Sequence, residues 1–223
     1  GSSMELFVNG VSLNSYATSF GTTSYFDIGR NPPGGNYFNG VVDEVVVVDS
    51  YSTDATEAIC KQHGVRFIRH RFLGHIEQKN WAILQATYPY ILSLDADEAL
   101  SDTLRASIMK VKNNWTHDGY YFNRLTNYCG KWIRHGSLFS GPVVRLWDSS
   151  VGSWKGISPY EELVPGPGTT KSFIEGDLHH YAFNSLEEHV EEIIARSTMA
   201  AVSYHKLNRP SRITDLTLRP FVF

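Results

Sequence analysis

An uninterrupted apolar run at residues 45–48 limits most strongly what this chain can fold into. Four consecutive valines lack the alternation of a strand with one wet face, so we expect a parallel strand buried on both faces. A polar turn with two acids follows at residues 49–54, and Asp54 with Glu57 fits a capping box for a helix that ends at Gly64. The stretch therefore predicts a strand, an acidic turn and a helix.

The same alternation continues along the chain. We expect strands at residues 65–70 and 90–98, a helix at 76–87 between them, and a helix capped by Ser101 after them. Such an order predicts an α/β fold with a mostly parallel sheet flanked by helices. Further on, strands are expected at 120–124 and 143–147, joined by a long loop, and Ser185 with Glu188 is expected to open the last long helix.

Residues 4–44 have a different character from the rest of the chain. They are rich in Gly, Asn, Ser and aromatic residues, with a hairpin signal at Asn9-Gly10 and a non-helical turn at residues 31–36. We expect an N-terminal antiparallel β segment here. Residues 1–3 have the composition of a tag remnant, so the expected units are 1–3, 4–44 and 45–223.

Composition narrows the functional classes. Hydrophobic residues make up 42% of the chain and charged residues 19%, which predicts a packed core. The net charge of −3 gives no support to a nucleic-acid partner. Two cysteines are too few for a disulfide framework or a zinc site, which favours a reducing, cytoplasmic setting.

Acidic side chains gather where two of the predicted strands end. One group is Asp49 with Asp54, and the other is Asp95, Asp97 and Glu98. Ligands of parallel α/β sheets bind at this edge, and close carboxylates repel each other unless a cation joins them. Oxygen ligands suit Mg²⁺ or Mn²⁺, which also bridge a diphosphate. The alternative is a solvated turn with no ligand.

Six separated motifs from residue 43 onward resemble a family 2 glycosyltransferase of the GT-A fold, of the lipopolysaccharide-core glucosyltransferase-like branch. They are "DEVVVVDSYSTDAT", "QKNWAI", "ILSLDADEAL", "NYCGKWIRHGSLFSGPVVRLW", "YEEL" and "LHHYAFNSLEEH". The resemblance implies an inverting, metal-dependent transfer of a sugar from a nucleotide-sugar, expected to be a UDP-sugar, to an acceptor hydroxyl. The implied setting is cell-surface polysaccharide or lipopolysaccharide synthesis, with a glycan or lipid-linked acceptor.

The resemblance also implies roles for individual residues. Donor binding is implied for Asp49, Gln78, Lys79, Asn80 and Asp95. Metal binding is implied for Asp97, Asp95 and His180. Acceptor binding is implied for Trp132, Arg134 and Arg145. Glu161 would be the general base, with Tyr160 where the family often has His.

Each of these residues also has a purely structural interpretation. Asp54 can serve only as a helix cap, and Lys79 can be a solvated helix residue. Glu161 can be a surface acid, His180 a core histidine, and Arg145 a strand-edge cation that reaches solvent.

The chain departs from the family at its N-terminal end. The usual first strand and turn are missing, and the block before residue 45 resembles a fragment of a laminin-G-like β-sandwich through "LFVNGV", "FDIGRNPPGGNYFNG" and "VVDEV". This predicts a chimera in which a strand from residues 4–30, best "MELFVNGV", fills the gap. An unfilled gap would leave an open edge and favour a homodimer. An inactive chimera and a carbohydrate-binding module without catalysis are the alternatives, and we expect the natural chain to continue into a membrane-facing segment at the inner face of the membrane.

Overall fold

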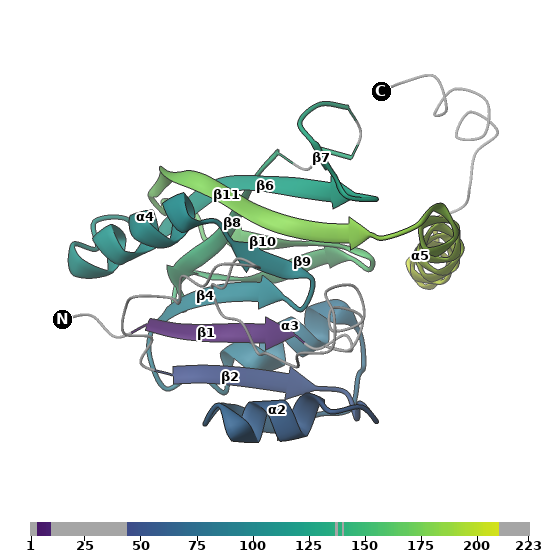
Figure 1. The fold of residues 1–223 in the computed structure, drawn as a ribbon, viewed down its shortest axis with the longest axis horizontal. Helices are drawn as coiled ribbons and strands as arrows, with labels where there is room; N and C mark the ends of the chain where they lie inside the picture. Colours follow the sequence, from purple (N-terminus) through teal and green to yellow (C-terminus); the bar gives the residue numbers. More distant parts are fainter. Residues whose placement is uncertain (1–3, 10–43, 137, 140, 210–223) are drawn as a thin grey trace.

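The computed structural model describes residues 44–136, 138–139 and 141–209, together with the backbone of residues 4–9 (Figure 1). The turn at 31–36 and most of the laminin-G-like block predicted for residues 4–44 lie outside the described residues. The predicted chimera therefore stays untested beyond the first strand.

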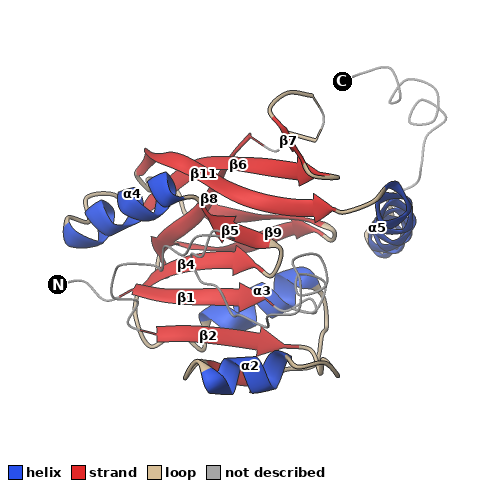
Figure 2. Ribbon diagram, in the orientation of Figure 1, coloured by secondary structure: helices blue, strands red, loops and turns tan. Residues whose placement is uncertain are grey.

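One large sheet organises the molecule (Figure 2). Its strands run in the order β3-β2-β1-β4-β8-β6-β11-β5, with β7 paired to β6, and β9 and β10 form a separate hairpin. The strands are β1 Met4–Asn9, β2 Glu44–Asp49, β3 Arg66–Arg69, β4 Tyr90–Asp95, β5 Glu98–Leu100, β6 Gly119–Tyr128, β7 Lys131–Ile133, β8 Gly141–Asp148, β9 Gly152–Ile157, β10 Tyr160–Pro165 and β11 Lys171–Phe183. The helices are α2 Thr56–Gln62, α3 His75–Ile83, α4 Asp102–Asn113 and α5 Leu186–Lys206. The predicted α/β class is confirmed.

Strand β1 occupies the centre of the parallel half of the sheet. It pairs in parallel with β2 on one side and with β4 on the other, so Val8 stands between Val47 and Leu94. The prediction that a strand from "MELFVNGV" fills the missing position is thereby confirmed for residues 4–9, and the rest of that stretch lies outside the described residues. The predicted antiparallel pairing is wrong for this strand, because both of its edges are taken up by parallel neighbours.

The valine run is buried on both faces, as predicted. Val46 and Val48 pack with Ala82 of α3 and with the β9–β10 hairpin, whereas Val47 packs with Cys60 of α2 and with α4 on the other face. Val46, Val47, Val48 and Cys60 have no exposed surface. Two apolar layers therefore fix the sheet, and α3 with the hairpin forms the layer that borders the candidate site.

Two of the three predicted helix caps are confirmed. The Ser101 hydroxyl accepts from the Leu104 amide, and the Ser185 hydroxyl accepts from the Glu188 amide. At the first helix the capping box is wrong, since Ala55 is the N-cap. Glu57 instead forms ion pairs with Lys61 and Arg69.

Among the helices that the structure describes, none combines the length and the apolar character that a membrane crossing requires. Helix α5 lies beyond the end of β11 (Figure 1) and buries only Ala200.

Helix α4 docks onto β11 at an irregularity of the strand. The register of β11 with β6 shifts between Phe173 and Asp177, and Gly176 within the shift has a φ of 111°. A Cβ atom at this position would lie 2.2 Å from the Leu104 nitrogen. The close approach of α4 therefore depends on glycine.

We expect Gly176→Ala to lower the free energy of unfolding by about 2–3 kcal/mol, because the new methyl group meets helix backbone that cannot move aside. Urea unfolding followed by circular dichroism measures the effect. Gly166→Ala is the matched control, since its Cβ would lie 3.5 Å from the nearest atom. Equal stability of the two variants would contradict this interpretation of the α4–β11 contact.

Candidate active site

The acidic strand ends lie at one edge of the sheet. Asp49 ends β2 and Asp95 ends β4, and β1 runs between them with Asn9 level with both Val48 and Asp95. Two strand spacings of about 4.8 Å therefore separate the ends of β2 and β4. This is the carboxyl edge, where ligands of parallel α/β sheets bind.

Asp95 is held by two buried cations. Lys79 Nζ lies 2.9 Å from one carboxylate oxygen and Arg145 Nη2 lies 2.9 Å from the other. Lys79 and Arg145 are 5% and 6% exposed. Burial alone would raise the pKa of the Asp95 carboxyl, but the charges of Arg145 and Lys79 outweigh it and hold that pKa well below its usual range.

A β-bulge directs Arg145 into this cluster. The β6–β8 pairing steps from Tyr120–Leu146 to Tyr121–Val144, which leaves Arg145 as the extra residue. Its Nη2 also lies 3.0 Å from Glu98 Oε1. Burial would lower the pKa of the guanidinium, but the neighbouring acids outweigh burial and raise it.

Glu98 is the most deeply buried acid of the cluster. Its side chain has no exposed surface, and Arg124 Nε donates to its Oε1 at 2.6 Å. Its Oε2 accepts from the Asp95 amide at 3.0 Å and so fixes the end of β4. The place of Glu98 in the acidic group was predicted from the sequence, whereas its partner Arg124 was not.

The β9–β10 hairpin brings Glu161 to the same cluster. Glu161 Oε1 lies 3.4 Å from Lys79 Nζ, and its other oxygen is buried without a hydrogen-bond partner among the described residues. Lys79 lies 4.3 Å above the Trp154 ring. The Asn80 side chain donates to the Trp154 carbonyl and accepts from the Trp154 amide, each at 2.9 Å. These two hydrogen bonds join α3 to the hairpin.

Gly156 permits this position of Glu161. The two residues are paired across the hairpin, and Gly156 has a φ of 118°. A Cβ atom there would lie 2.4 Å from the Tyr160 oxygen and 3.3 Å from Glu161 Cα. A side chain at position 156 would therefore move the acid away from Lys79.

Asp97 has different partners from Asp95. It lies in the turn between β4 and β5, its side chain is 42% exposed, and His180 Nε2 lies 3.0 Å from its Oδ2. The Tyr181 amide donates to the Asp97 carbonyl at 2.9 Å. The described residues contain no group of three or more His, Cys, Asp or Glu side chains able to share one metal ion.

The turn after β2 is organised by Asp49 and Gln78. Asp49 is fully buried and accepts from both the amide and the hydroxyl of Ser52. Gln78 Nε2 donates to the Ser50 hydroxyl at 3.2 Å, and its Oε1 lies 2.8 Å from His70 Nδ1. Gln78 therefore links α3 to this turn.

The predicted acceptor residues are not all brought together. Trp132 on β7 is 37% exposed, and its ring centroid lies 4.5 Å from that of His179 and 5.4 Å from that of Tyr181. Arg134 is exposed just after β7. Arg145, in contrast, belongs to the buried cluster around Asp95.

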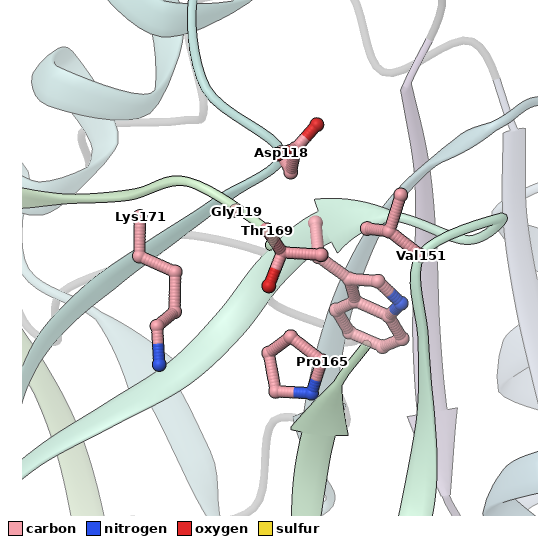
Figure 3. A pocket seen from close by; sticks show the side chains of 7 residues that line it. Asp118, Gly119, Val151, Pro165, Thr169 and Lys171 are labelled. Carbon is pink, nitrogen blue, oxygen red and sulfur yellow. The ribbon is translucent and has the colours of Figure 1, made fainter. Parts of the chain in front are cut away.

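A hollow lies away from these residues, where β6 and β11 begin and β8 ends (Figure 3). It has an empty volume of about 180 Å³ and is lined by Asp118, Trp147, Pro165 and Lys171, among others. That volume includes open solvent, and the hollow has no room for a water molecule. The hollow is too small to compete with the carboxyl edge as the candidate site.

Comparison with known proteins identifies relatives of the chain. An uncharacterized glycosyltransferase of Rickettsia felis is 41% identical over 85 residues, which cover 38% of this chain and 30% of that protein. The lipopolysaccharide core biosynthesis glycosyltransferase LpsC of Rhizobium meliloti is 37% identical over 67 residues, which cover 28% and 25%. The chain thus spans about 30% of the length of the curated relatives it matches.

A solved structure shares the fold. TarS 1-349 of S. aureus in complex with UDP-GlcNAc aligns with a TM-score of 0.50 and 13% identity, over 84% of this chain and 60% of that one. At this identity the likeness concerns the fold alone. The model of the family described as glycosyl transferase family 2 matches residues 39–190, more than half of the chain. The chain belongs to glycosyl transferase family 2.

Proposed function

We propose that this domain transfers a sugar from a UDP-sugar to an acceptor hydroxyl with inversion at the sugar carbon. The observation that carries the proposal is that Lys79 joins Asp95 and Glu161 at the carboxyl edge of the sheet, with Asp97 and His180 paired in the turn that follows β4. UDP is the favoured donor nucleotide because the fold relative TarS is in complex with UDP-GlcNAc.

Two side chains at this edge could hold a divalent cation, Mg²⁺ or Mn²⁺. Asp97 is partly exposed and lies beside His180, so the two side chains offer an oxygen and a nitrogen donor. Asp95 already forms ion pairs with Lys79 and Arg145. We therefore assign it to positioning these two cations rather than to binding the metal ion directly. Mg²⁺ is commonly held by one or two carboxylates with substrate phosphates completing its shell. When bound, the ion would offset the negative charge of the donor diphosphate.

The donor site would extend from Asp97 to the turn after β2. Asp49 and Gln78 hold that turn, and we assign them to the nucleoside end of the donor. Lys79 is assigned to the diphosphate end, because it is the cation that contacts both Asp95 and Glu161. Asn80 acts through the hairpin that it fixes to α3.

Glu161 is assigned as the general base. It would take the proton of the acceptor hydroxyl as that oxygen attacks the anomeric carbon, opposite the diphosphate. A carbon–oxygen bond forms, the bond to the diphosphate breaks, and the diphosphate leaves with the electron pair. Trp132 and Arg134 are assigned to the acceptor side, where the exposed indole offers a stacking surface.

The similarity to LpsC, a lipopolysaccharide core biosynthesis glycosyltransferase, supports lipopolysaccharide or another cell-surface glycan as the product. We extend the proposal to synthesis at the cytoplasmic face of a membrane. We take β1 and residues 45–223 as one glycosyltransferase unit, because β1 lies between β2 and β4. This arrangement favours a working domain over an inactive chimera.

Isothermal titration with UDP in the presence and absence of Mn²⁺ tests the proposal. We expect Mn²⁺ to strengthen UDP binding at least tenfold, and Asp97→Ala to remove that gain because the exposed carboxylate is lost. Asp118→Ala is the matched control. Asp118 lies just before the start of β6, and its carboxylate accepts a hydrogen bond from the Thr170 amide. Mn²⁺-dependent binding that survives Asp97→Ala would overturn the assigned metal ligand, and no UDP binding by the folded protein would overturn the function.

A further inference from the structure

We propose that Tyr51 stacks on the base of the donor nucleotide, an inference that rests on the proposed function. Tyr51 lies in the turn after β2, at the carboxyl edge of the sheet, and has a φ of 66°. Its side chain is exposed, with 59% of its surface in contact with solvent.

The backbone of Tyr51 is in a conformation that a bulky residue rarely adopts. In the left-handed region the Cβ atom crowds the neighbouring carbonyl, whereas glycine adopts this region freely. Strain of this kind persists where the surroundings fix the backbone, and it gathers at ligand sites. A glycine would therefore be the unstrained choice for this turn.

Both neighbours of Tyr51 are held in place. Ser50 receives a hydrogen bond from Gln78, and Ser52 donates its amide and hydroxyl to the buried Asp49. The chain before the turn is fixed as well, since the His70 amide donates to the Asp49 carbonyl at 2.8 Å. The turn thus imposes the φ of Tyr51 from both sides.

The phenol ring makes no contact in the described part of the protein that would offset this backbone strain. No side-chain hydrogen bond or ring contact joins Tyr51 to another described residue. Its large exposed surface also places Tyr51 outside the buried core. What the ring offers is a flat aromatic surface, one strand away from β1 and two from Asp95.

A flat heteroaromatic ring is the ligand chemistry that this surface fits. Base–aromatic stacking strengthens binding by about tenfold per base or more, and it requires no hydrogen bond from the ring. A nucleoside diphosphate whose diphosphate lies near Asp97 would reach toward the turn after β2 with its base. Tyr51 would then contact the base, while Asp49 and Gln78 hold the turn beneath it.

The test compares Tyr51→Gly, Tyr51→Ala and Tyr51→Phe in UDP titrations with Mn²⁺, each with a thermal unfolding curve. Tyr51→Gly removes both ring and strain, so we expect UDP binding to weaken about tenfold while the melting temperature stays equal or rises. Tyr51→Ala should weaken binding equally without the gain in stability. Tyr51→Phe keeps the ring and should bind UDP within twofold of the unaltered protein.

The outcomes separate this inference from the function beneath it. UDP binding by Tyr51→Gly at the unaltered affinity would overturn the stacking role and leave the donor site standing. A fall in melting temperature in Tyr51→Gly would show that the ring stabilises the fold, which also contradicts the inference. No UDP binding by the unaltered protein would overturn both.

Discussion

Replacing Arg145 with methionine should lower the free energy of unfolding by about 3 kcal/mol, one of the two largest effects that we expect in this domain. The variant keeps the apolar bulk of the side chain but leaves Asp95 and Glu98 with one cation each, Lys79 and Arg124. Removing one member of a buried ion-pair network costs more than the network contributes as a whole, because the remaining charges stay desolvated. Urea unfolding at pH 7 measures the loss.

Arg69→Met provides the control, because Arg69 pairs with Glu57 on the surface and is half exposed. We expect it to cost less than about 1 kcal/mol. The low pKa of Asp95 adds a pH signature: its carboxylate contributes stability above about pH 4 and loses it only at lower pH. The gap between the Arg145 variant and the unaltered protein should therefore narrow below about pH 4. A gap that is small at pH 7, or that grows on acidification, would contradict the proposed network.

Replacing Glu161 with glutamine should reduce turnover by about 10²-fold or more, since the proposed general base is lost. The measurement is UDP release from UDP-GlcNAc, with water as the acceptor. UDP affinity should change less than threefold, because the assigned role concerns the acceptor rather than the donor.

Glu162→Gln is the matched control for this prediction. Glu162 is the next residue on β10 and is exposed, whereas Glu161 is directed at Lys79. We expect the control to keep the full rate. Equal rates in the two variants would remove Glu161 from the reaction, and a loss of UDP binding in Glu161→Gln would instead make it a donor residue.

Much of the fold could be predicted because local signals agreed with the packing. The unbroken valine run requires two buried faces, and the structure supplies one apolar layer on each side of β2. Ser101 and Ser185 were predictable as caps because each directly precedes a helical pattern. In the structure each hydroxyl accepts from the amide three residues later. The central place of β1 followed from the need to fill a missing strand.

Other features depend on contacts between distant segments and left no local signal. The long strand β11 was not predicted, because its register shift at Gly176 interrupts the alternation. The helix expected at residues 76–87 is shorter in the structure, since α3 ends at Ile83 and Leu84 beyond it is 78% exposed.

The site shows the same division. The carboxyl edge and its acids were predictable, since parallel strands end together. The separation of Asp95 from Asp97 was not, because it depends on β4 ending at Asp95 and on cations from α3 and β8. The inward position of Arg145 depends on a bulge whose partner strand is β6.

A crystal structure of this domain grown with UDP and Mn²⁺ tests the central claim most directly. The account predicts the nucleotide at the carboxyl edge of β1, β2 and β4, with an anomalous Mn²⁺ peak within bonding distance of Asp97 and the base beside the turn that holds Tyr51. Nucleotide bound elsewhere, or a sheet in which β1 does not separate β2 from β4, would contradict it.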